Sequence, residues 1–92
     1  MRALRVVVRG GVQGVGYRWF VRDEAEQAGV TGWVRNRRDG SVEAELQGEA
    51  AQLEAVLDAM RAGPPAARVD ELTVEETDSP TRSRGLEIRP TV

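Results

Sequence analysis

The chain alternates between two hydrophobic periodicities, and the order of these patterns constrains the fold more than any other feature. Residues 2–9 alternate apolar and charged side chains with a period of two, which indicates a strand with one buried face. Similar patterns lie at 30–36 and 41–47, and a fourth strand is expected within 68–77. A short closing strand is expected at 86–89.

Two longer segments have the helical period instead. The segment 17–29 ends at a glycine suited to a helix C-cap, and the segment 49–63 ends at a glycine followed by two prolines. Each places its apolar residues on one arc of a helical projection. The expected core positions are Phe20, Val21, Ala25 and Ala28 in the first helix, and Leu53, Val56, Leu57 and Met60 in the second.

The order strand, helix, strand, strand, helix, strand predicts an α/β (α+β) fold. We expect a ferredoxin-like β-α-β-β-α-β sandwich, with an antiparallel sheet and both helices on one face. The 92 residues predict a single domain, 1–92. Asp39-Gly40 predicts a type I′ hairpin turn. Val69 is out of step with Leu72 and Val74, which predicts a bulge or a late start in the fourth strand.

The composition removes most of the usual catalytic groups. The chain has no His, Cys or Lys, so thiol nucleophiles, His bases, Schiff-base lysines and nearly every zinc site are excluded. No metal or cofactor is expected. The net charge of −2 argues mildly against general nucleic-acid binding. No apolar run approaches the roughly 18 residues of a membrane span, and a cytoplasmic location is expected.

Four glycines lie in the segment 10–16, between the first strand and the first helix. Gly11 and Gly16 have the spacing of the nucleotide-binding pattern G-x-x-x-x-G-K-[ST], but the Lys and the Ser or Thr are missing after Gly16. A dinucleotide-binding G-x-G-x-x-G beginning at Gly14 fails at Trp19. Neither nucleotide motif is therefore present.

The physical basis of anion binding remains at this loop. Successive main-chain N–H groups of a glycine-rich loop can converge on an anion, and a helix N-terminus adds free N–H groups and a positive dipole end. Arg18 lies in the first helical turn, where a cation is normally unfavourable unless an anion lies beside it. The alternative interpretation is a tight turn followed by an ordinary surface arginine.

Asn36, the only asparagine, ends the second expected strand. Its amide could orient a water molecule near the glycine loop, since the first and second strands of a β-α-β unit lie close together. Asparagine is equally common at strand ends and turns for purely structural reasons. Arg35, Arg37 and Arg38 either make a positive mouth for this site or form a solvated rim of the hairpin.

Several segments resemble the acylphosphatase family closely. G-x-V-Q-G-V-G-Y-R is present at Gly10–Arg18, and G-W-V-R-N-x-x-D-G-S-V-E at Gly32–Glu43. Q-G-E at Gln47–Glu49 and G-P-P-A-A-R-V at Gly63–Val69 extend the resemblance over essentially the whole chain. Leu86 departs from the family pattern, where an aromatic residue is expected.

The resemblance implies an enzyme that hydrolyses a small-molecule acyl phosphate to a carboxylate and inorganic phosphate. It places the family's catalytic arginine on Arg18 and its catalytic asparagine on Asn36. It also places the phosphate-binding loop on Gln13, Gly14, Val15, Gly16 and Tyr17. No nucleic-acid or membrane partner is expected, and a monomer is expected.

The composition is compatible with this reaction. The leaving carboxylate has a pKa of about 4, so it departs without a proton donor. Two other classes of protein fit the residues less well. An RNA-binding sheet would need exposed aromatic residues, and the four aromatic residues form no such pattern. An anion sensor without catalysis would not need both Arg18 and Asn36.

Overall fold

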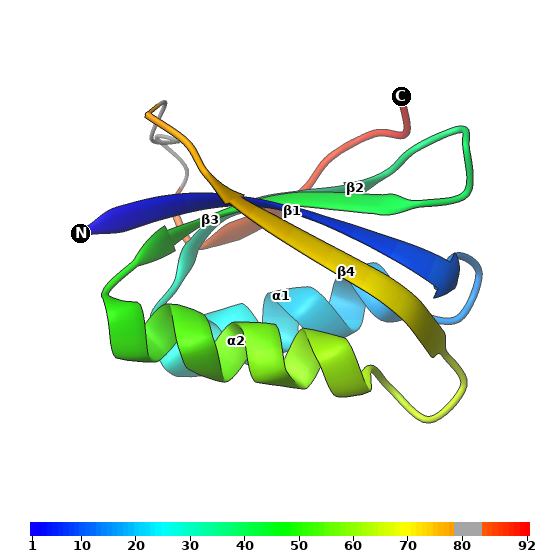
Figure 1. Ribbon diagram of the computed structural model, residues 1–92, viewed down its shortest axis with the longest axis horizontal. Helices are drawn as coiled ribbons and strands as arrows, with labels where there is room; N and C mark the ends of the chain where they lie inside the picture. The colour runs from blue at the N-terminus through cyan, green and yellow to red at the C-terminus, as the bar shows by residue number, and fades with distance from the viewer. Residues whose placement is uncertain (79–83) are drawn as a thin grey trace.

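The computed structural model describes residues 1–78 and 84–92. Figure 1 shows one sheet with both helices packed against the same face. The elements are β1 (Arg2–Gly11), α1 (Tyr17–Ala28), β2 (Thr31–Asn36), β3 (Val42–Gly48), α2 (Ala50–Ala62), β4 (Arg68–Glu76) and β5 (Leu86–Ile88). The predicted order of strands and helices is confirmed, and so is the short closing strand.

The sheet has the strand order β4-β1-β3-β2-β5. β1 pairs antiparallel with β3 and β4, and β2 pairs antiparallel with β3. The prediction of an antiparallel sheet is wrong at one edge, because β5 pairs parallel with β2. β4 runs opposite to β2, so its last residue lies at the end of the sheet where β2 starts. β5 also starts at that end, beside β2, and therefore runs in the same direction as β2.

The turn between β2 and β3 is not the predicted type I′. That turn needs a positive φ at both central residues. Gly40 has φ +93°, whereas no non-glycine residue among those described has a positive φ. Asp39 instead uses its side chain, and Oδ1 accepts hydrogen bonds from the Ser41 N–H (2.9 Å) and hydroxyl (2.5 Å). These bonds lower the pKa of Asp39 to about 2.

The predicted irregularity in the fourth strand is a β-bulge. Arg9 pairs with Glu71 and Gly10 pairs with Val69, so Asp70 has no partner opposite it in β1. The strand therefore begins early and changes register, which explains why Val69 is out of step with the rest of β4.

The core lies between the sheet and the two helices. β1 contributes Leu4, Val6 and Val8, as the alternation predicts, and all four predicted positions of α2 are buried. In α1, Val21 and Ala25 are buried as predicted, but Phe20 and Ala28 are only partly buried. Tyr17, which is not among the expected core positions, is buried, and its hydroxyl donates to the Met60 carbonyl (2.7 Å).

Candidate active site

The loop between β1 and α1 is an open arrangement of main-chain donors. Gly14 and Gly16 have φ +74° and +77°, a conformation that favours glycine, and no atom of the described residues lies within 4 Å of where a Cβ would project. Gly16 caps α1 without a side-chain hydrogen bond, and the first turn has no acidic residue. Within residues 1–78 and 84–92, the N–H groups from Gly14 to Arg18 donate no hydrogen bond. The loop can therefore donate to an anion.

Gln13 ties this loop to the turn between β2 and β3. Its Nε2 donates to the carbonyl oxygens of Arg37 (2.7 Å) and Ser41 (2.9 Å). A side-chain amide has two hydrogens, and both are used here. The side chain of Gln13 therefore ties the loop to this turn, and its Nε2 has no hydrogen left to donate to a substrate.

The other two side chains of the predicted loop point inward. Tyr17 is 1% exposed, and its hydrogen bond to Met60 anchors the start of α1 in the core. Burial raises the pKa of its hydroxyl. Val15 is partly buried and packs against the same core. With its side chains turned inward, the loop presents its main chain to the outside.

Asn36 ends β2 on the face of the sheet that the helices cover, in step with the buried Val34. It pairs with Val42, which in turn pairs with Val8 near the end of β1. The side-chain Oδ1 of Asn36 is buried and accepts no hydrogen bond from any described residue. A buried acceptor without a donor is unusual, and it marks a place for a water molecule or ligand.

Arg18 lies at the same end of the molecule. Figure 1 shows the end of β1, the start of α1 and the turn after β2 together at this end. Arg18 is partly buried, and it forms no ion pair or hydrogen bond within the described part of the chain. The fold thus brings the glycine loop, Arg18 and Asn36 to one end of the sheet.

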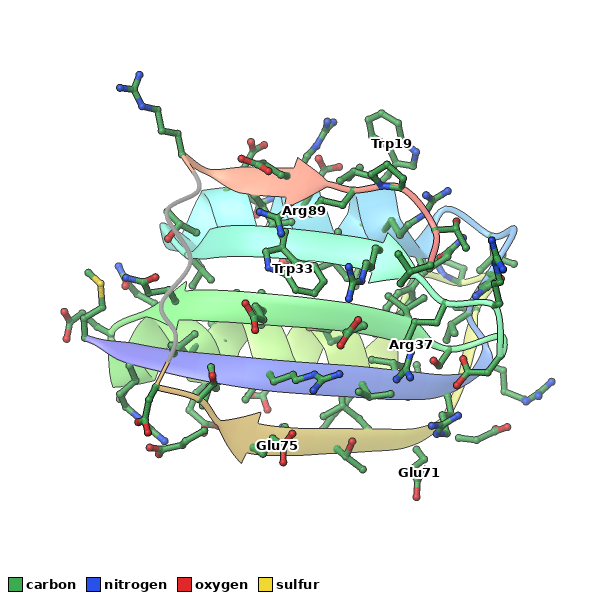
Figure 2. The ribbon with its side chains drawn as sticks, turned by 90° about the horizontal axis from the view of Figure 1, so that it is seen from above. Trp19, Trp33, Arg37, Glu71, Glu75 and Arg89 are labelled. Atoms are coloured by element: carbon green, nitrogen blue, oxygen red, sulfur yellow. The ribbon has the colours of Figure 1, made fainter. Side chains whose placement is uncertain are left out.

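Arg35 does not belong to this site. It points to the open face of the sheet, opposite Asn36, where it binds the buried Glu43 (2.8 Å) and stacks on Trp33. Figure 2 shows Trp33 on this face with Arg89 beside it. Both earlier interpretations of Arg35, as part of a positive mouth or of a solvated rim, are therefore wrong. Arg37 and Arg38 lie in the turn itself.

The described residues hold no group of three or more His, Cys, Asp or Glu side chains placed to bind a metal ion. None of the helices in the described ranges has the length and apolar character needed to cross a membrane.

Comparison with known proteins identifies the family. The family model described as Acylphosphatase matches residues 4–88. The chain belongs to the acylphosphatase family. Acylphosphatase from Anaeromyxobacter dehalogenans (strain 2CP-C) is 51% identical over 85 residues, which cover 92% of this chain and 91% of that protein. Acylphosphatase from Alcanivorax borkumensis (strain ATCC 700651) is 48% identical, covering 96% and 99%.

The solved structures agree with this assignment. The crystal structure of acylphosphatase from Bacillus subtilis superposes with a TM-score of 0.92 at 37% identity, covering 97% of this chain and 99% of that one. The acylphosphatase from Coxiella burnetii gives a TM-score of 0.89 at 35% identity, covering 96% and 92%. This chain therefore has the ferredoxin-like fold. It is an acylphosphatase, an enzyme that hydrolyses acyl phosphates.

The sequence did not reveal the positioning role of Gln13 or the contacts of Arg22. Gln13 acts on a turn 24 residues away, and nothing local indicates such a contact. Arg22 follows Arg18 at a spacing of four, which places both cations on one helix face. This spacing is the one sequence feature that indicates a shared location for Arg18 and Arg22.

Proposed function

We propose that the chain hydrolyses acyl phosphates with the loop main chain and Arg18 holding the phosphoryl group and Asn36 orienting the attacking water. The observation that carries this proposal is that hydrogen-bonding groups without partners in the described structure lie together at one end of the fold. The loop offers donors without acceptors, and Asn36 offers a buried acceptor without a donor.

The phosphoryl group is the partner that suits the donors. The N–H groups from Gly14 to Arg18 lie at the positive end of α1, where an anion is stabilised. The guanidinium of Arg18 presents a planar fork that matches two phosphate oxygens and stays charged at neutral pH. Because no described acidic group neutralises Arg18, its charge is free to act on the substrate.

The attacking water suits the acceptor. Oδ1 of Asn36 accepts one hydrogen of the water and directs its oxygen toward phosphorus. The new bond joins the water oxygen to phosphorus, and the bond from phosphorus to the acyl oxygen breaks. Positioning of this kind supplies much of the rate in phosphoryl transfer, because the loose transition state asks little of the nucleophile.

Neither a strong base nor an acid is needed. The leaving group is a carboxylate with a pKa of about 4, so it departs as an anion. The proton of the water passes to a phosphoryl oxygen, and the products are a carboxylate and inorganic phosphate. We further propose that the reaction needs no metal ion, because the loop and Arg18 supply the positive charge that a metal would otherwise supply.

Phosphate release from benzoyl phosphate, measured with excess chelator, tests this proposal. We expect turnover well above spontaneous hydrolysis, and loss of that turnover in both Arg18→Ala and Asn36→Ala while circular dichroism shows the native fold. Binding of inorganic phosphate without turnover would instead indicate an anion sensor. Turnover that the chelator abolishes would contradict the metal-independent mechanism.

A further inference from the structure

The exposed Trp19 and the partly buried Arg22 form a pair on α1, and Arg22 lies one helical turn after Arg18. The guanidinium carbon of Arg22 lies 4.3 Å from the centroid of the Trp19 ring, which is a cation–π contact. Trp19 is 54% exposed, and Figure 2 shows it standing clear of the sheet beyond β5. The indole of Trp19 is not part of the hydrophobic core. Its exposed surface can therefore contact a ligand.

The side chain of Arg22 runs back toward the start of α1. Trp19 precedes it by three residues and belongs to the first turn, so the guanidinium lies at the level of that turn. Long side chains on helices lean toward the N-terminus, and this geometry places the cation on the same end as Arg18 and the glycine loop. Glu26 follows Arg22 by four residues, yet the two form no ion pair in the described structure.

No acidic side chain in residues 1–78 and 84–92 forms an ion pair with Arg22. Its Nε is buried and has no hydrogen-bond partner in the described structure, and its neighbour Arg18 also lacks an ion pair. Like charges four residues apart destabilise a helix, and cations at the N-terminal end oppose the helix dipole. The first turn contains no acidic residue to balance them. In the proposed mechanism Arg18 and the loop N–H groups hold the phosphoryl group, which leaves Arg22 as a cation without an anionic partner among the described residues.

We propose that Arg22, held on Trp19, binds an anionic group on the acyl part of the substrate. The enzyme then favours acyl phosphates whose acyl group carries a second anion, a carboxylate or a phosphate. Arg18 holds the transferred phosphoryl group, Arg22 receives the distal anion, and the indole face packs against the carbon skeleton between them. This inference rests on the proposed function and adds a selectivity for the acyl group.

The test compares two substrates that differ in one distal group. 4-Carboxybenzoyl phosphate carries the second anion, and 4-methylbenzoyl phosphate replaces it with a neutral group of similar size. The para position keeps the carboxylate from attacking its own acyl phosphate. For Arg22→Gln we expect kcat/KM to fall about fivefold with the carboxylated substrate and less than about twofold with the methylated one, as for a partly exposed charge pair.

Arg61→Gln is the matched control, because Arg61 is an exposed arginine of α2 that pairs with Asp58. It should leave the ratio of the two kcat/KM values unchanged, and Arg22→Lys should retain part of the preference. In the wild type, added salt should lower the rate with the carboxylated substrate more strongly, because screening weakens the second contact.

An equal loss on both substrates in Arg22→Gln would make Arg22 a structural residue and overturn the inference. A wild-type preference that neither salt nor Arg22→Lys alters would overturn it as well. Failure of the proposed function is recognised separately, since the wild type would then hydrolyse neither substrate above the spontaneous rate.

Discussion

The amide of Gln13 donates to the carbonyl oxygen of Arg37 at 2.7 Å, and this contact holds the glycine loop against the turn that follows Asn36. A second bond from the same nitrogen reaches Ser41. The two halves of the proposed site, one that holds phosphate and one that holds water, are therefore joined by a single side chain.

Gln13→Leu should remove the contact between the glycine loop and the turn after β2. Two partly buried carbonyls lose their donor, and we expect a destabilisation of about 1–3 kcal/mol in urea unfolding together with a lower kcat. Gln27→Leu is the control, because Gln27 is exposed on α1 and should change stability by less than about 0.5 kcal/mol. A native kcat in folded Gln13→Leu would show that the loop keeps its place without this contact.

Asn36→Ala should separate binding from chemistry. Without the oxygen that orients water, we expect kcat to fall by about 10²-fold or more. The inhibition constant for inorganic phosphate should change little, because the loop and Arg18 are untouched. Loss of phosphate affinity in parallel with kcat would mean that Asn36 contacts the phosphoryl group rather than the water.

Arg18→Lys should be nearly as inactive as Arg18→Ala, for which we expect a loss of about 10³-fold in kcat. Lysine keeps the charge but presents a point cation in place of the planar fork that binds two oxygens. Steady-state kinetics with benzoyl phosphate and phosphate as inhibitor measure both effects. Activity within about tenfold of the wild type in Arg18→Lys would show that charge alone suffices.

Gly16→Ala should strain the loop. The left-handed conformation at φ +77° costs a residue with a Cβ about 1–2 kcal/mol, although the space around it is open. Gly11→Ala is the matched control, since Gly11 has no positive φ and its Cβ would make ordinary contacts with Arg68. Urea unfolding should place Gly16→Ala well below Gly11→Ala. Equal stabilities would mean that the loop relaxes in the variant.

Glu43 should make stability depend on pH in the acid range. It is 2% exposed, and although burial acts to raise its pKa, hydrogen bonds from Arg35 and Arg5 outweigh it and lower that pKa below the ordinary 4.5. A lowered folded-state pKa stabilises the protein above the unfolded value. This stabilisation is lost as the pH falls through the folded value.

Glu43→Gln should therefore be less stable than the wild type by about 1–3 kcal/mol at pH 7, and the difference should shrink below about pH 4.5. Glu76→Gln is the control, because Glu76 forms an exposed pair with Arg2 whose loss should cost less than about 1 kcal/mol. Urea unfolding from pH 7 to pH 3 measures both. A difference that stays constant with pH would assign the loss to packing and not to the charge.

Much of the fold and of the site could be read from local patterns. The alternation of Leu4, Val6 and Val8 predicts the buried face of β1, because side chains of a strand alternate between two faces whatever lies beside it. The motif around Arg18 and the asparagine in G-W-V-R-N identify the family without coordinates. The hairpin turn was located correctly, but its type depended on the hydrogen bonds that Asp39 makes with Ser41.

The sequence by itself determined which segments are strands and helices and where the chain turns. These properties follow from backbone preferences and hydrophobic spacing, which act over a few residues. Only the tertiary structure decided that β5 runs parallel to β2, that Arg35 binds Glu43 away from the site, and that Gln13 joins the loop to the turn. Such contacts join residues far apart in the chain, and their partners are chosen by packing of the whole fold rather than by local pattern.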